Sequence, residues 1–268
     1  MFLALAKRSF DGMRAVLVAV AAVVSLFQVA VVLQAASFDR QQLLQTLGRM
    51  LPAFVERWLG ENIVTLGSFG GMVALGYFHP VVVLLVAIAT AFVASDPAAD
   101  VEEGYVDLLL SRPLARHWLI TRSAALAVAC PLILGALMMA ATWTTIALVA
   151  RPAAQAPSAR TIVILAAHLA AVAWCFGALS LALASAARRR NTPLGSAAVA
   201  AVGLYLIDVL AASWEPARVV DVLSPFHYYR GTEILAGVAH SVRDLAVLAS
   251  TSVVLIAVAY WNFNARDF

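Results

Sequence analysis

The sequence predicts an all-α integral membrane protein, and three observations lead to that fold class. The chain is 63% hydrophobic and its mean hydropathy is +0.90. Only 12% of its residues are charged, about half the share found in an average soluble domain. Six predominantly apolar runs are long enough to cross a hydrocarbon core, which needs about 20 apolar residues in a helix. We therefore expect a single transmembrane domain over residues 1–268, with spans at about 15–38, 72–94, 119–149, 161–187, 194–212 and 245–262.

Three segments outside these spans are expected to lie at the membrane surface. Residues 1–14 alternate apolar and charged positions at helical spacing, which is typical of an interfacial amphipathic helix. Residues 39–62 repeat apolar side chains at spacings of three and four, with Arg49 and Arg57 on the polar face. Residues 213–244 combine prolines, aromatic residues and apolar pairs, which indicates interfacial or re-entrant elements.

Prolines and basic residues refine this topology. Pro80 is expected near the outer end of the second span, and Pro131 is expected to kink the third. Six crossings place both termini on one side of the membrane. The arginine run 188–190 directly follows the fourth span, and short basic segments close to helix ends indicate the cytoplasm. We therefore expect a multi-pass protein with both termini cytoplasmic.

Composition and motifs argue against several other classes. The basic residues are scattered between apolar runs, so nucleic acid is not an expected partner. Cys130 and Cys175 lie in separate runs without metal-ligand spacing, so neither a metal site nor a disulfide is expected. An intramembrane hydrolase is not expected either, since Ser180 and His168 are about 18 Å apart along one predicted helix and neither HExxH nor GxSxG occurs.

The segment 95–118, between the second and third spans, contains five of the 15 acidic residues of the chain. They are Asp96, Asp100, Glu102, Glu103 and Asp107. A carboxylate at the centre of a bilayer costs about 2.5–3.5 kcal/mol. The segment must therefore lie outside the hydrocarbon, on the side of the termini.

The spacing within this segment predicts a helix with two faces. One face carries Asp96, Asp100, Glu103 and Asp107, and another carries Val101, Tyr105, Leu108 and Arg112. We expect the apolar face to pack on the membrane helices and the acidic face to meet a basic partner. Asp96 followed by Pro97 predicts the N-cap and first residue of the helix, and Gly104 predicts an interruption. A solvated loop is the alternative from composition alone.

The stretch "EEGYVDLLLSRPLAR" (102–116) resembles the segment between the second and third helices of permease subunits of type-2 ABC transporters, in the copper-enzyme-maturation and multidrug-like group. In that family this segment contains, in order, an acidic residue, a glycine, a leucine-rich turn, a serine, an arginine or tyrosine, a proline and a basic residue. "LSPFHYYRG" (223–231) is similar to the family's region before the last helix, and "WNFNARDF" (261–268) resembles its ending. The chain departs from the pattern at Tyr105, Val106 and Asp107.

This resemblance implies a permease subunit of an ATP-driven exporter in the bacterial cytoplasmic (inner) membrane. Segment 95–118 would be a cytoplasmic coupling helix that docks on a separate ATPase subunit. The docking residues it implies are Glu102, Glu103, Gly104, Asp107, Leu109, Arg112 and Pro113. A P-loop needs a lysine after a glycine-rich turn, and the only lysine here is Lys7, in "LAKRS". The chain itself is thus expected to bind no cofactor and to be no enzyme. ATP and Mg²⁺ would bind the partner ATPase. A second permease, identical or different, would complete the transporter in the lipid membrane.

His168 and Asp208 are the main ionisable residues within the predicted spans, which makes them candidates for a substrate path. The alternative is that His168 is a neutral packing residue and that Asp208 reaches water near the outer end of its helix. A secondary transporter or channel working without an ATPase is the alternative function. A secondary transporter would show broken helices in matched positions of its two halves and buried acidic residues that couple to ions. Pro131 and Asp208 are features of that kind. This alternative leaves the acidic segment 95–118 unexplained.

Overall fold

The structure is a computed structural model that describes residues 2–37, 67–106, 117–149, 156–237 and 241–265. Within these residues every regular element is helical. The long helices are α1 (Phe2–Ser37), α5 (Phe69–Phe78) with α6 (Pro80–Ala94), α9 (His117–Val149), α10 (Ala159–Ala184), α11 (Asn191–Ala211) and α14 (Ser241–Asn264). They give six stretches that are long and apolar enough to cross a membrane. The prediction of a multi-pass, all-helical membrane protein is confirmed.

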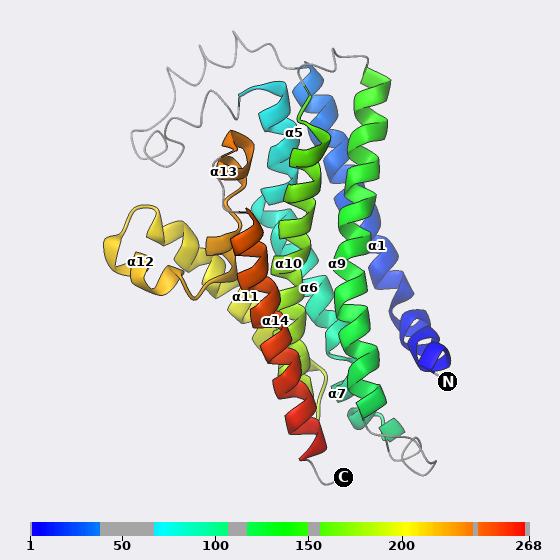
Figure 1. Ribbon diagram of the computed structural model, residues 1–268. Helices are drawn as coiled ribbons and strands as arrows, with labels where there is room; N and C mark the ends of the chain where they lie inside the picture. The colour runs from blue at the N-terminus through cyan, green and yellow to red at the C-terminus, as the bar shows by residue number, and fades with distance from the viewer. Residues whose placement is uncertain (1, 38–66, 107–116, 150–155, 238–240, 266–268) are drawn as a thin grey trace.

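The helices form one bundle in which the start of α1 and the end of α14 lie at the same end (Figure 1). We refer to this as the terminal end. The short helix α7 (Asp96–Glu102) also lies there. Three further short helices connect α11 with α14, namely α12 (Glu215–Asp221), the 3₁₀ helix η2 (Pro225–Tyr228) and α13 (Gly231–Ala236), and they lie away from the terminal end.

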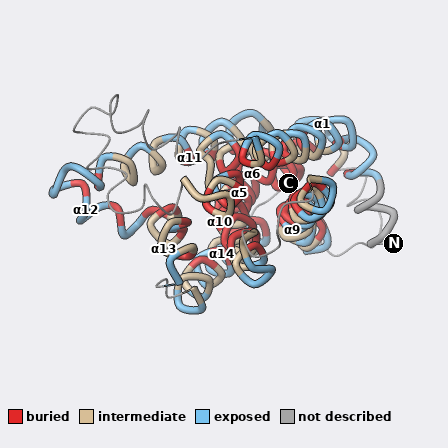
Figure 2. Tube along the Cα trace, turned by 90° about the horizontal axis from the view of Figure 1, so that it is seen from above, coloured by how far each residue is buried: buried red, intermediate tan, exposed pale blue. Residues whose placement is uncertain are grey.

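Helix α10 is the centre of the bundle and packs against α6, α9, α11 and α14, as the buried residues in Figure 2 show. It approaches α6 closely. Ser180 Oγ donates a hydrogen bond of 2.8 Å to the backbone oxygen of Ala91, and a Cβ added to Gly177 would lie 2.7 Å from Thr90 Cγ2. Small residues at a crossing let two backbones approach, which is a usual basis of helix packing in membranes.

The outer faces of the bundle are apolar. Large exposed side chains occur on α1, α9, α11 and α14, among them Val18, Leu26, Leu132, Val199, Leu206, Val253 and Trp261. So many exposed apolar side chains would disfavour a soluble monomer. In a bilayer they contact lipid, and the helical backbone satisfies its own hydrogen bonds.

The first helix differs from the prediction. Residues 2–14 do not form a separate surface helix, because α1 runs without interruption from Phe2 to Ser37. No proline occurs in this stretch, and Met13, at the expected junction, is buried. The span therefore continues as one helix into the segment that was expected to lie on the membrane surface. The amphipathic helix predicted at 39–62 lies outside the described residues.

The second span is discontinuous. Helix α5 ends at Phe78, His79 has an extended backbone (φ −62°, ψ 130°), and α6 begins with Pro80. A residue before proline is disfavoured in the α region, whereas proline itself suits the first position of a helix. The break lies close to the middle of the stretch Phe69–Ala94, so the prediction that Pro80 lies near the end of the span is wrong. Pro131, in contrast, lies inside α9, which stays one helix.

Candidate functional site

Helix α7 begins and ends close to the residues predicted from the sequence. Its N-cap is Ser95 and Pro97 lies in its first turn, so the predicted N-cap, Asp96, is wrong by one residue. Ser95 Oγ donates to the backbone oxygen of Phe92 at 2.7 Å, which joins the end of α6 to the start of α7. At the other end, Gly104 has φ +68°, the left-handed conformation that commonly terminates helices. The predicted interruption at Gly104 is confirmed.

A buried arginine from α9 binds the first turn of α7. Arg122 Nη2 lies 2.9 Å from Asp96 Oδ2 and 2.7 Å from Asp100 Oδ2. The two aspartates are four residues apart, so both carboxylates lie on one helical face. Arg122 has no exposed surface. The contact is therefore a buried guanidinium between two carboxylates.

The start of α1 holds the same face of α7. Arg8 Nη1 lies 3.1 Å from Asp100 Oδ1, and Arg8 Nη2 lies 3.5 Å from Glu103 Oε2. Ser9 Oγ donates to Asp96 Oδ2 at 2.6 Å. Residues expected to lie on the membrane surface thus form part of an internal contact.

The junction between α10 and α11 makes the third attachment. The backbone N–H of Arg190 donates to Glu102 Oε2 at 2.9 Å, and the carboxylate lies at the start of α11, where the helix dipole favours negative charge. Arg190 Nε donates to Ser95 Oγ at 3.2 Å and Nη2 donates to Phe92 O at 3.3 Å. Its guanidinium carbon lies 4.2 Å from the centre of the Phe92 ring.

These contacts form what we call the α7 charge network. Its members are Arg8, Ser9, Ser95, Asp96, Asp100, Glu102, Glu103, Arg122 and Arg190. It connects three spans, α1, α9 and α11, to one short helix. Asp96 and Asp100 are only 8% and 4% exposed, so these two residues of the predicted acidic face lie inside the protein and cannot meet a partner, whereas Glu103 of the same face is exposed. Buried carboxylates need paired charges, and arginines distant in the sequence supply them here.

The exposed part of α7 is its C-terminal end. Glu102, Glu103 and Gly104 are exposed there, and they are three of the residues expected to dock on a partner. The other four, Asp107, Leu109, Arg112 and Pro113, lie outside the described residues.

The chain turns back toward the bundle after Gly104. Val106 is 2% exposed and belongs to a cluster with Leu119 of α9 and Phe263 of α14. Tyr105 lies under the guanidinium of Arg8, with 3.4 Å between Arg8 Cζ and the ring centre. Val101, the first residue of the face expected to pack on the membrane helices, also packs against this cluster, and Leu108 and Arg112 of that face lie outside the described residues.

The two candidates for a substrate path have different surroundings. His168 is fully buried on α10; its Nδ1 lies 2.8 Å from Ile164 O, and its ring stacks on Tyr229. Asp208 is partly exposed and lines a pocket with residues of α12 and α13. The surroundings of His168 match the packing interpretation.

Sequence reasoning missed the basic side of the network. Arg190 served only as part of the basic run 188–190 that indicates topology, and Arg8 and Arg122 were assigned no partner. One signal was present, because Arg122 lies inside the apolar run that begins at Leu119, and an ionisable residue in such a run usually has a specific partner.

Comparison with known proteins matches no family model and no curated protein. A functional assignment therefore depends on the geometry of the α7 charge network and on the motif at 102–116.

Proposed function

We propose that this chain is the transmembrane permease subunit of an ATP-driven exporter of the type-2 ABC class. In this proposal the terminal end is cytoplasmic, and α7 with the residues that follow it docks on a separate ATPase subunit. One observation carries the proposal: one short helix is paired to three spans, to α1 and α9 through Asp100 and to α11 through Glu102, and its C-terminal end is exposed and acidic.

The network provides a route for movement from the exposed end of α7 to the spans. Asp100 contacts Arg8 of α1 and Arg122 of α9 with its two oxygens, while Glu102 contacts the start of α11. A displacement of α7 therefore acts on three spans together. Packed helices respond to such a displacement by rigid-body shifts. ATP and Mg²⁺ bind the partner subunit, which supplies the energy of the cycle.

The exposed end of α7 also defines the chemistry of its partner. Glu102 and Glu103 carry two negative charges beside Gly104. Electrostatic complementarity predicts a groove on the ATPase with arginine or lysine at its edge. The full transporter contains two such ATPases and a second permease, identical or different, and the apolar outer faces of each permease contact lipid.

A secondary transporter or channel is the second candidate, and the break between α5 and α6 favours it. Helices that are discontinuous inside the membrane line binding sites in secondary transporters, and His79 interrupts the second span near its middle. This candidate predicts that the chain alone, in liposomes, transports its substrate under an ion gradient without ATP. The ABC proposal predicts no transport in that experiment.

Co-purification tests the ABC proposal. The full chain, solubilised from its native membrane in mild detergent, should retain a protein that contains a P-loop and hydrolyses Mg-ATP with inhibition by orthovanadate. The double variant Glu102→Lys with Glu103→Lys should lose most of this partner and its activity, because it reverses the exposed charge. Asp11→Lys is the matched control, since Asp11 is exposed near the terminal end but lies outside α7. Retention of the partner and its full activity by the double variant would contradict the docking assignment.

A further inference from the structure

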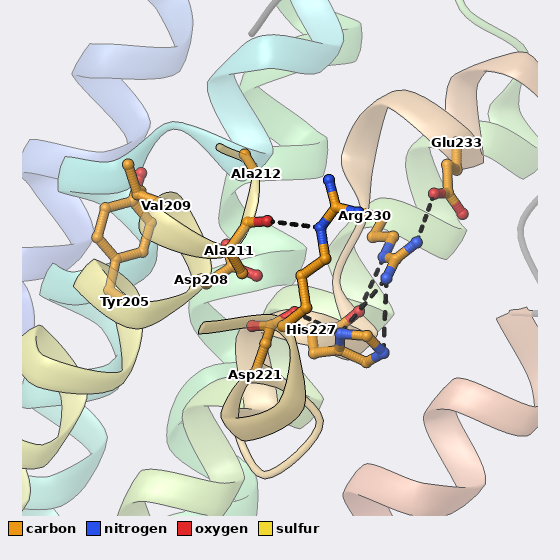
Figure 3. Close-up of a pocket in the computed structure, with 10 residues that line it drawn as sticks. Tyr205, Asp208, Val209, Ala211, Ala212, Asp221, His227, Arg230 and Glu233 are labelled. Carbon is orange, nitrogen blue, oxygen red and sulfur yellow. Dashed lines mark hydrogen bonds and ion pairs between the residues drawn. The ribbon is translucent and has the colours of Figure 1, made fainter. Parts of the chain in front are cut away.

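A second charged site lies away from the α7 charge network. It is a pocket of about 470 Å³ between the end of α11 and the short helices α12, η2 and α13 (Figure 3). This volume is in the range of sites for small molecules. Its charged and titratable side chains are Asp208, Arg218, Asp221, His227, Arg230 and Glu233. Tyr205 and Val209 contribute to the apolar part of its wall.

Two of these charges neutralise each other. Arg230 Nη1 lies 2.9 Å from Glu233 Oε1, and Arg230 Nε donates to the backbone oxygen of His227 at 3.2 Å. The hydrogen bond to Glu233 is the main cause that raises the pKa of Arg230 above its ordinary value. This pair adds little net charge and leaves Asp208, Arg218 and Asp221, with His227 bound to Asp221, to determine what the pocket binds.

Asp221 is the residue that indicates a ligand. It is only 7% exposed. Its Oδ2 lies 2.6 Å from His227 Nδ1, its Oδ1 is buried without a nitrogen or hydroxyl donor among the described residues, and its other polar neighbour in the pocket is a second carboxyl group, that of Asp208. A buried carboxylate oxygen without a donor is unfavourable, because it loses its water and gains nothing in return. A donor supplied by a ligand in the pocket would satisfy it.

Asp208 and Arg218 define the rest of that ligand. Asp208 lines the same pocket from α11 (Figure 3), so two carboxylates favour a cationic group there. Arg218 is held against the end of α11 by a 3.1 Å hydrogen bond from its Nε to Ala211 O, and its guanidinium suits an anionic group. A metal ion is not indicated, because within the described ranges no three histidine, cysteine or acidic side chains are arranged to hold one.

We propose that this pocket binds a small zwitterion that carries a primary ammonium group beside a phosphate or carboxylate. The ammonium group donates to Asp221 Oδ1 and lies beside Asp208, and the anionic group faces Arg218. This chemistry occurs both in soluble molecules and in the ethanolamine head group of a phospholipid. The pocket is formed by this chain alone, so the inference does not depend on an ATPase partner.

Calorimetry on the full chain tests this inference, in nanodiscs of phosphatidylcholine and phosphatidylglycerol. The probes are phosphoethanolamine, ethanolamine and inorganic phosphate. Phosphoethanolamine should bind at least tenfold more tightly than either of the other two. Asp221→Asn and Asp208→Asn should each weaken its binding at least tenfold, and Arg218→Gln should reduce it to the level of ethanolamine. Glu215→Gln is the control, because Glu215 is on α12, exposed, and not part of the pocket wall.

A second arm distinguishes the lipid from the soluble source. In nanodiscs that contain phosphatidylethanolamine as well, native mass spectrometry should detect its selective retention if the head group is the occupant, and Asp221→Asn should abolish that retention. Thermal unfolding of each variant verifies folding. The inference is overturned if neither arm shows binding, if ethanolamine or phosphate alone binds as tightly as phosphoethanolamine, or if a folded Asp221→Asn protein binds like the wild type.

Discussion

Arg122 of α9 and Asp100 of α7 form a buried ion pair, with 2.7 Å between Nη2 and Oδ2, and Arg122 has no exposed surface. The other oxygen of Asp100 binds Arg8 of α1 at 3.1 Å. One carboxylate thus fixes α7 relative to two spans. The exposed end of α7 is therefore positioned by the membrane helices and not by its own short sequence.

Removal of Arg122 should strongly destabilise the protein. Arg122→Gln removes the buried cation that Asp96 and Asp100 share and leaves Asp100 with Arg8 alone. Breaking a buried pair from one side costs about 3–5 kcal/mol. Arg122→Lys should recover part of this loss, because a single nitrogen, Nη2, makes both carboxylate contacts in the wild type. Thermal unfolding in detergent measures the effect. Arg243→Gln is the control: Arg243 pairs with Asp244 at the surface, and such pairs contribute about 0–1 kcal/mol. If Arg122→Gln were as stable as the wild type, the buried ion pairs of Arg122 would not contribute to the stability of the fold.

Neutralising the aspartates should compensate for that loss. In Arg122→Gln the cost comes from uncompensated carboxylates, so adding Asp96→Asn and Asp100→Asn should restore part of the melting temperature. Groups in one network give coupling energies of about 0.5–3 kcal/mol in a mutant cycle. A cycle of unfolding midpoints for the single and combined variants tests this expectation. Strictly additive losses would show that the three side chains act independently.

Gly104 should be sensitive to substitution for a conformational reason. A Cβ at this position would meet no atom within 4 Å, but the backbone has φ +68°, which costs an ordinary L-residue about 1–2 kcal/mol. Gly104→Ala should therefore lower stability, and Gly104→Asn should be milder, because asparagine tolerates this region. Gly12→Ala, in open space within α1, should be neutral or stabilising. Chemical unfolding compares the three variants, and a neutral Gly104→Ala would be inconsistent with the turn.

Gly177 should be required for the contact between α6 and α10. An added Cβ would lie 2.7 Å from Thr90 Cγ2, so Gly177→Ala must displace Thr90 or separate the helices. Overpacking of this kind costs about 1–3 kcal/mol. Gly135→Ala is the matched control, because its nearest atom would be Ala166 O at 3.6 Å, an ordinary contact. Thermal unfolding that ranks Gly135→Ala as the more damaging change would contradict the packing described for α10.

The sequence predicts the spans well and their connections poorly. Apolar runs place the fourth, fifth and sixth spans within a few residues of α10, α11 and α14, because burial in lipid selects long apolar runs regardless of tertiary contacts. The effect of Pro80 was underestimated: it divides the second span in two, since proline excludes its predecessor from the helix. Conversely, the polar residues before Ala15 predicted a separate segment on the membrane surface, but α1 is continuous there. Arg8 and Ser9 contact α7, while Asp11 and Arg14 are exposed.

The candidate site was located by the sequence, but its orientation was not. The acidic residues and Gly104 indicated a short interrupted helix, which is present. Helical periodicity groups Asp96, Asp100 and Glu103 on one face, yet it does not say whether that face lies inward or outward. The partners of the first two, Arg122 of α9 and Arg8 of α1, come from other spans, and only the tertiary packing of the bundle brings them together.

Site-specific photo-crosslinking tests the docking of α7 most directly. A benzophenone amino acid replaces Glu103 at the exposed end of α7 in the full chain, and Glu215 of α12 in a control variant. After irradiation of native membranes, position 103 should crosslink to a protein with a P-loop, and position 215 should not. Absence of any such crosslink from position 103, in a variant that still transports its substrate with ATP, would contradict the account.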